Sequence, residues 1–405
     1  MLRTKPLLMI ACGSFFLCGC ISAAEPAITA AEAQPPQIEA SAEEPTGAPT
    51  GAPIPQPPTV LDVDQFQPQS AIAGCDIGAE LQPAESGEIA HYAASLEQAQ
   101  SYSLSKGSVG LIVLKNGRVI HEQYDNGATA INRTTSLSMM KSVLGLSVGI
   151  ALEKGLIGSL NDPVGSYLPE WQNDPRGSIT IEQLLTMSSG LGPSNFGALM
   201  AAPNARPLVL GLDLVTEPGS SFAYNNAVSA ILGFALDGRV KAAGYSGFAD
   251  FLQKELWCPL GNDDAALWLD GADNPRFYAG MQANLRDWAR LGELIRNKGK
   301  VGERQVVSEA WIDAMLTPSD ANAQYGYQIW LGGEWTANRS YGPATPLTVP
   351  HSEPYGAPDV MFFDGFGGQR VYVVPSHGLT IARTGLINLT YDDSIIVNAL
   401  LKASE

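Results

Sequence analysis

Basic residues, histidine and cysteine are all scarce in this 405-residue chain. It has 24 lysines and arginines against 41 aspartates and glutamates, which gives a formal net charge of −17. Such a surface repels nucleic acid and anionic lipid headgroups, so nucleic acid is excluded as a partner. The four histidines and five cysteines form no cluster with metal-ligand spacing. We therefore expect neither a metal nor another cofactor.

None of the four histidines is suitably placed for a serine–histidine triad. Residues 145–149 fit the Gly-x-Ser-x-Gly elbow of α/β-hydrolases, but that elbow needs a strand before its serine. Here Ser147 falls within a helical pattern that is already under way from Ser138. The histidines precede the core or fall on a hairpin strand, in a proline-rich loop and in a hairpin turn: His91, His121, His351 and His377. We expect the small residues at 145–149 to allow close helix packing.

The first 20 residues have the pattern of a signal peptide. Two basic residues precede an apolar run at 7–17 that is too short to span a membrane as a mature anchor. A Leu-Cys-Gly-Cys sequence ending at Cys20 resembles a bacterial lipobox, which predicts lipidation of Cys20; cleavage after Ala24 is the alternative. Ile21 stands where inner-membrane lipoproteins carry aspartate. The resemblance therefore predicts an exported protein facing the bacterial periplasm, with a lipid anchor in the outer membrane.

Residues 21–69 follow as a compositionally biased segment. They are rich in alanine, proline, glutamate and glutamine, and no lysine or arginine occurs between Lys5 and Lys106. Such a segment cannot bury enough apolar surface to offset its conformational entropy, so we predict a disordered tether. Residues 70–405 then form one large domain, which is long enough to bury a sizeable core.

Cysteine usage leaves one pair inside that domain. Cys12 and Cys18 leave with the signal segment, and Cys20 is taken by lipid. Cys75 and Cys258 remain in an oxidising compartment. They either form one disulfide or stay as two separate buried thiols.

Ser138 and Lys141 form the most informative motif of the chain. One helical turn stacks positions i and i+3 on the same face, so the lysine amine can reach the serine hydroxyl. The following run is apolar, which disfavours the charged lysine and suits it to activate a serine nucleophile. A second Ser-x-x-Lys at 103–106 lies in a polar stretch with no such run behind it. The alternative role for Ser138 is an ordinary helix N-cap.

A Tyr-x-Asn sequence at 224–226 supports the same interpretation. It follows a turn and precedes an apolar helical run at 230–236. A phenol held near an ammonium has its anion favoured and can relay a proton, and the Asn226 amide can hydrogen-bond a substrate carbonyl. A similar sequence at 124–126 ends a hairpin strand instead of opening a helix.

With both motifs placed, the chain resembles the serine β-lactamase and penicillin-binding-protein superfamily, in its class C-like branch. That branch also contains carboxylesterases, D-amino-acid peptidases and 6-aminohexanoate-dimer hydrolase. The supporting stretches are Leu160–Pro163, Tyr167–Glu170, Thr180–Leu185, Ser188–Leu191 and Arg286–Gly292. The resemblance implies that Ser138 is the acylated nucleophile, Lys141 its activating amine and Tyr224 the general base.

The third motif of the family departs from its usual form. Relatives carry Lys-Thr-Gly or His-x-Gly, whereas the corresponding region here reads Gly-Phe-Gly-Gly-Gln at 365–369. Its glycines permit close approach to a ligand, and Gly367, Gly368 and Gln369 are candidates for substrate or oxyanion contacts. Arg383-Thr384-Gly385 is the alternative, although it falls on the next expected strand. Loss of the cation removes a partner for a substrate carboxylate and favours neutral esters or amides.

The expected fold is an α/β (α+β) arrangement. Two hairpins lie at opposite ends of the domain, at 110–123 around Asn116-Gly117 and at 370–383, and a helix at 393–401 closes the chain. Strands from both ends can meet in one antiparallel sheet flanked by helices, with an all-helical domain inserted between them. The family resemblance implies the same fold, with the active site in the cleft beneath the loops at 193–219 and 332–359.

Two functions remain open on this evidence. The first is a lipid-anchored serine hydrolase that cleaves small esters or amides through an acyl-enzyme. The second is a catalytically weak binding or cell-wall-sensing lipoprotein that keeps the fold. The intact Ser138, Lys141, Tyr224 and Asn226 set favours the hydrolase, and the altered third motif favours the binding protein.

Overall fold

The computed structural model describes residues 59–77 and 80–403. The predicted signal segment, Cys20 and most of the predicted tether lie outside these residues. Residues 59–68, which the composition assigned to the tether, pack on the domain instead. Val60 is buried and its carbonyl accepts the Thr135 N–H at 2.9 Å, while the Phe66 ring lies 4.9 Å from the Trp268 ring. The folded domain therefore begins before residue 70, because the Val60 and Phe66 side chains pack against the rest of the domain.

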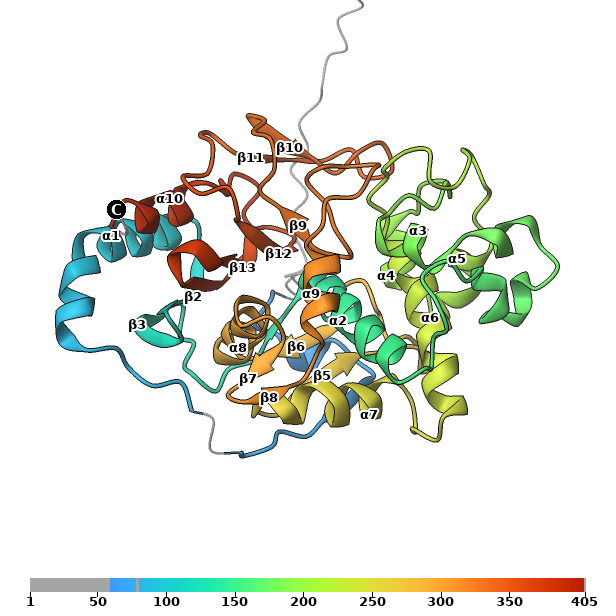
Figure 1. The fold of residues 1–405 in the computed structure, drawn as a ribbon, viewed down its shortest axis with the longest axis horizontal. Helices are drawn as coiled ribbons and strands as arrows, with labels where there is room; N and C mark the ends of the chain where they lie inside the picture. Colours follow the sequence, from blue (N-terminus) through green and yellow to red (C-terminus); the bar gives the residue numbers. More distant parts are fainter. Residues whose placement is uncertain (1–58, 78–79, 404–405) are drawn as a thin grey trace, which may run out of the picture. The chain divides into compact units, whose positions relative to one another are not determined.

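In the described part of the chain, a six-stranded antiparallel sheet carries the fold, with the order β3-β2-β14-β13-β12-β9 (Figure 1). Its strands are β2 (Ser108–Lys115), β3 (Arg118–Tyr124), β9 (Trp330–Leu331), β12 (Met361–Gly365), β13 (Gln369–Val374) and β14 (Leu379–Gly385). Strand β2 pairs with β14, so the two ends of the domain meet in one sheet as predicted. Asn116 and Gly117 both have positive φ, as a two-residue hairpin turn requires.

Helices cover both faces of this sheet. Helix α8 (Leu285–Arg296) packs on β2, β13 and β14, while α1 (Ser86–Ser105) and α10 (Ile395–Leu401) lie side by side (Figure 1). A Cβ at Gly292 of α8 would lie 2.6 Å from Thr380 and 2.8 Å from Val371. Glycine at this position therefore lets the helix lie close against the strands. The predicted mixed fold of antiparallel sheet and flanking helices is confirmed.

The inserted part between the two hairpins is mainly helical. Its helices are α2 (Met140–Glu153), α3 (Ile181–Leu185), α4 (Phe196–Ala201), α5 (Arg206–Leu210), α6 (Asn226–Ala242), α7 (Phe248–Leu252) and α9 (Glu309–Met315). Helix α2 is buried on every side over residues 140–151. A Cβ at Gly149 would lie 2.2 Å from the Trp311 ring, and one at Gly145 would lie 2.7 Å from the Tyr327 carbonyl. The small residues thus permit close packing, as expected.

A second sheet joins the start of the domain to its middle. Its order is β1-β5-β6-β4, with β1 (Gln69–Ile72), β4 (Thr134–Thr135), β5 (Ala265–Trp268) and β6 (Met281–Ala283). Two-stranded pairs are formed by β7 (Lys300–Val301) with β8 (Arg304–Gln305), and by β10 (Asn338–Ser340) with β11 (Thr348–Pro350). Among residues 59–77 and 80–403, no helix combines the length and apolar character needed to cross a membrane.

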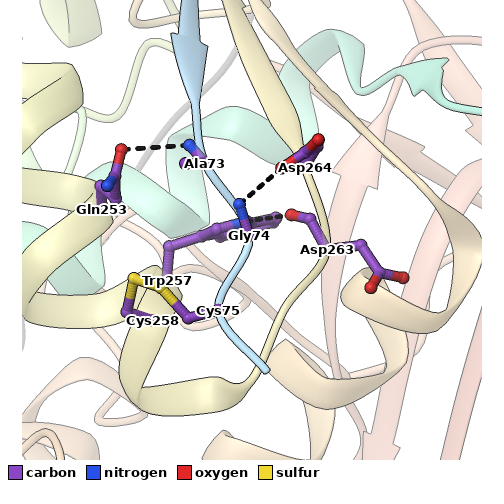
Figure 2. The surroundings of a disulfide bond; sticks show 8 residues. All are labelled: Ala73, Gly74, Cys75, Gln253, Trp257, Cys258, Asp263 and Asp264. Carbon is purple, nitrogen blue, oxygen red and sulfur yellow. Dashed lines mark hydrogen bonds between the residues drawn. A yellow bond between two sulfur atoms is a disulfide. The ribbon is translucent and has the colours of Figure 1, made fainter. Parts of the chain in front are cut away.

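Cys75 and Cys258 are joined in a disulfide (Figure 2). The segment after β1 reaches it through backbone contacts: the Ala73 N–H donates to Gln253 Oε1 at 3.0 Å and the Gly74 N–H donates to Asp264 Oδ1 at 2.7 Å. A Cβ on Gly74 would lie 2.7 Å from the Asp263 carbonyl carbon. The disulfide therefore fastens the N-terminal strand to the middle of the domain across 183 residues of sequence.

Removing this disulfide should destabilise the domain, because the closed loop restricts the unfolded chain. We expect replacement of both Cys75 and Cys258 by serine to lower the free energy of unfolding by about 2–5 kcal/mol. Urea unfolding measures this difference, and added reductant should destabilise the unmodified chain but not the double variant. Equal midpoints for the two proteins under oxidising conditions would contradict the prediction.

Candidate active site

Ser138 lies in a short 3₁₀ turn, residues Leu137–Met139, immediately before α2. The turn is fixed to β6, because the Ser136 N–H donates to the Met281 carbonyl at 2.7 Å and the Met281 N–H donates to Ser136 Oγ at 3.2 Å. Leu137 has a φ of 46°, a conformation that residues with side chains rarely adopt. Tertiary contacts therefore hold Ser138 in a strained turn, where its side chain is half-buried and lines a cavity.

Lys141 projects from the first turn of α2 into three acceptors. Its Nζ donates to Ser138 Oγ at 3.0 Å, to Asn226 Oδ1 at 2.7 Å and to the Tyr278 carbonyl at 3.0 Å. The side chain is only 1% exposed. Burial lowers the pKa of Lys141 to about 7, although the charge of Asp364 opposes this shift. A large share of the amine is therefore neutral at neutral pH and can accept the Ser138 proton.

Tyr224 approaches the same pair from the segment before α6. Its N–H donates to the Tyr341 carbonyl at 3.1 Å, and its carbonyl accepts from Thr345 Oγ1 at 2.7 Å. Its ring centroid lies 4.7 Å from Lys141 Nζ. Burial raises the pKa of Tyr224 well above its ordinary value, and a hydrogen bond with Ser138 opposes this only partly. The expectation that a nearby ammonium favours the phenolate is wrong in direction, because desolvation outweighs it.

Two consecutive asparagines at the start of α6 have different roles. The Asn225 side chain accepts the Ala227 N–H at 3.0 Å and donates to the Gly192 carbonyl at 2.8 Å, so it caps the helix and ties it to a loop. Asn226 instead accepts from Lys141 and lines the cavity in front of Ser138. The structure therefore brings together Ser138, Lys141, Tyr224 and Asn226, as the two motifs predicted.

The cavity in front of Ser138 has a volume of about 400 Å³. Both predicted loops contribute to its walls. It is lined by Leu137, Ser138, Ser194, Asn195, Phe196, Tyr224, Asn226, Ala279, Tyr341, Ala344, Thr345, Pro346, Leu347 and Phe366. None of these described residues carries a charged side chain. The aromatic residues Tyr325 and Trp330 pack against the Tyr224 ring and do not line the cavity themselves.

Residues of the third motif lie at two different cavities. Phe366 lines the cavity with Ser138, whereas Gly367 and Gly368 line a smaller cavity beside it. The Gln369 side chain is fully buried, donating to the Gly385 carbonyl at 2.8 Å and accepting the Gly385 N–H at 2.8 Å. The Gln369 side chain therefore joins two strands of the sheet, and a substrate or oxyanion contact from the Gln369 backbone N–H stays a prediction.

The alternative third motif and the elbow-like sequence both make structural hydrogen bonds. Arg383 of the alternative third motif donates from Nε to Ser103 Oγ at 3.0 Å and from a terminal nitrogen to the Lys106 carbonyl at 2.8 Å. It therefore holds the end of α1, where the second Ser-x-x-Lys lies. Ser147 of the elbow-like sequence is fully buried and donates back to the Val143 carbonyl at 2.8 Å.

A buried group of four charged residues lies behind the site and was missed by sequence reasoning. Arg339 and Arg370 each pair with both Asp364 and Asp393, at 2.5–3.1 Å. The Tyr341 hydroxyl donates to Asp364 at 2.5 Å, so the group reaches the cavity wall. The four residues come from β10, β12, β13 and the segment before α10. No local pattern in the sequence could have linked these four residues. The same holds for the hydrogen bond from Lys141 to the Tyr278 carbonyl.

Comparison with known proteins identifies the family of this chain. The family model for Beta-lactamase matches residues 93–399. The 6-aminohexanoate-dimer hydrolase of Paenarthrobacter ureafaciens is 24% identical over an alignment of 231 residues that covers 52% of this chain. The matched region spans 58% of the length of that curated relative.

Solved structures share the fold. A Bacillus anthracis protein assigned provisionally as a 6-aminohexanoate-dimer hydrolase has a TM-score of 0.69 at 17% identity, covering 85% of this chain and 92% of its own. A family VIII carboxylesterase has a TM-score of 0.58 at 16% identity, covering 80% of this chain and 99% of its own. At such identities the likeness shows the fold alone, whereas the family match spans most of the chain. The chain belongs to the Beta-lactamase family and has the β-lactamase fold.

Proposed function

We propose that this protein cleaves neutral esters and small amides through an acyl-enzyme formed on Ser138. The observation that carries the proposal is the 3.0 Å contact between Ser138 Oγ and a buried Lys141 amine whose pKa is lowered to about 7. A serine becomes a competent nucleophile when a neighbouring base takes its proton. Neutral Lys141 is that base, and no histidine is required.

The proton then moves through Tyr224. Because burial keeps Tyr224 a phenol, we assign it the role of relay between Lys141 and the leaving group, in place of the general base that the family resemblance implies. Ser138 Oγ attacks the carbonyl carbon, the bond to the leaving group breaks, and the leaving group takes a proton from Tyr224. Water attacks the acyl-enzyme by the reverse path. Backbone N–H groups of Ser138 and of the turn at 366–368 are the proposed donors to the oxyanion.

The substrate class follows from the cavity. No charged side chain lines it among the described residues, and Phe366 stands where relatives carry a cation-bearing motif. A substrate carboxylate would have no charged partner in this cavity, whereas an uncharged ester or amide does not need one. The names of the carboxylesterase and of the 6-aminohexanoate-dimer hydrolase agree with ester and amide cleavage. The altered third motif also keeps a catalytically weak binding protein as the second candidate.

We also propose that the mature chain is a lipoprotein of the outer membrane, anchored at Cys20 and facing the periplasm. If so, replacing Cys20 by serine should release the protein from the detergent phase or block removal of the signal segment. Mass spectrometry of the mature N-terminus checks this directly. A mature chain that begins at Glu25 without lipid would contradict the proposal.

Ser138 should be the only residue that a fluorophosphonate probe labels. We expect Ser138→Ala to abolish labelling and turnover, because the hydroxyl is the attacking group. Ser103→Ala and Ser147→Ala are matched controls and should keep labelling, since both hydroxyls are fully buried in structural hydrogen bonds. Labelling that survives in Ser138→Ala and disappears in Ser147→Ala would move the nucleophile to the elbow-like sequence.

The protein should hydrolyse short-chain p-nitrophenyl esters faster than a chromogenic cephalosporin, whose carboxylate gains no charged partner. Phe366→Lys should raise the cephalosporin-to-ester ratio of kcat/KM by about one to two decades, since a charge-assisted hydrogen bond is worth about 1.5–3 kcal/mol. Phe366→Leu is the control and should leave the ratio unchanged. Efficient cephalosporin turnover without esterase activity would refute the substrate class, and silence on every substrate would favour the binding protein.

Activity should rise with pH as Lys141 loses its proton. Because burial lowers the pKa of Lys141 to about 7, kcat/KM for a neutral ester should increase through pH 7 and level off above it. In Asn226→Asp a carboxylate replaces the amide whose oxygen lies 2.7 Å from Nζ, which favours the ammonium and should move this limb up by about 1–3 pH units. Asn195→Asp lines the same cavity and should leave the limb in place. An unmoved limb in Asn226→Asp would contradict the role of Lys141.

A further inference from the structure

A second, smaller cavity adjoins the one in front of Ser138. It has a volume of about 60 Å³ and shares three walls with the larger cavity, namely Tyr341, Leu347 and Phe366. A water-sized group occupies about 10–15 Å³ by this measure, so there is room for about four to six such groups. The two cavities therefore meet at these three side chains.

The side cavity is a built feature of the fold. Its floor is the turn at Gly367 and Gly368, where a Cβ on Gly367 would lie 2.7 Å from Ile387 and one on Gly368 would lie 2.9 Å from the Tyr391 ring. Both glycines have positive φ. The turn therefore lies close against the segment that follows β14, and the space that remains between this segment and Leu347 is the side cavity.

Its chemistry suits an aliphatic group. Leu389 and Leu347 line the cavity with exposed fractions of 63% and 44%, and the neighbouring Ile387 is 51% exposed. Exposed aliphatic side chains gathered at the edge of a pocket are typical of a binding site. Arg370 also contributes to the lining, but its charge is compensated by ion pairs to Asp364 and Asp393 at 2.5 and 2.8 Å. The cavity therefore offers apolar contact without an uncompensated charge.

The position of the proton relay, Tyr224, decides which half of the substrate can enter the side cavity. The leaving group must sit beside Tyr224 to receive its proton, and neither Tyr224 nor Asn226 lines the side cavity. The acyl half lies on the other side of the carbonyl carbon. We propose that the side cavity is an acyl-chain subsite, which takes an unbranched aliphatic acyl group of about four to six carbons. This inference rests on the proposed ester or amide cleavage at Ser138.

A chain-length series tests the subsite. For p-nitrophenyl acetate, butanoate, hexanoate and octanoate, kcat/KM should rise by about fourfold for each added methylene up to hexanoate, equivalent to about 0.8 kcal/mol each, and then level off. Alkyl acetates that lengthen the alcohol instead should show no such rise. A rise on the alcohol side with a flat acyl series would overturn the assignment of the acyl half.

A surface variant locates the effect. Leu389→Asp places a carboxylate in the side cavity and should lower kcat/KM for the hexanoate by tenfold or more while changing the acetate by less than twofold. Leu208→Asp on α5, where the leucine is 49% exposed, is the matched control and should change neither. An unchanged hexanoate-to-acetate ratio in Leu389→Asp would overturn the subsite even if every ester is cleaved. A protein that cleaves no ester, and whose Ser138 no alkylphosphonate labels, would refute the proposed function and the subsite with it.

Discussion

Lys141 occupies a place that water does not reach, and no ion pair to it is found among residues 59–77 and 80–403. A cation in such a place is held by hydrogen bonds alone, so its neutral form gains in free energy relative to its charged form. The all-round burial of α2 over residues 140–151 produces this state. The same helix fixes the amine 3.0 Å from the Ser138 hydroxyl. Burial thus produces both the base and its alignment.

The buried charge group behind the cavity gives this arrangement a rigid support. The Arg339 guanidinium lies 4.2 Å from the centre of the Trp330 ring, and Trp330 packs against Tyr224. Arg370 also donates to the carbonyl of Gly365 at 2.6 Å, directly before the turn that carries Phe366. Loss of one partner from such a group leaves an uncompensated buried charge, which is strongly destabilising. The group therefore supports both Tyr224 and Phe366 in the lining of one cavity.

Local patterns predicted what local forces decide. The Asn116-Gly117 turn, the buried helix after Ser138 and the i, i+3 contact with Lys141 depend on neighbours in sequence, and the structure contains all three. The direction of the Tyr224 pKa shift could not be read in this way, because it depends on burial by distant aromatic residues. The inward orientation of Gln369 depends on the pairing of β13 with β14. The packing of Val60 and Phe66 inside a tether-like composition likewise depends on surfaces that only the folded domain offers.

The proposed catalysis depends on one ionisation, that of the Lys141 amine. Nuclear magnetic resonance can follow the Lys141 side chain directly, with ¹³C-labelled lysine and Lys141→Arg to assign the signal. The Lys141 signal should titrate with a midpoint near pH 7, because burial lowers its pKa to about 7. A Lys141 midpoint near the ordinary lysine value of about 10.4 would contradict the claim that this amine is the base at neutral pH.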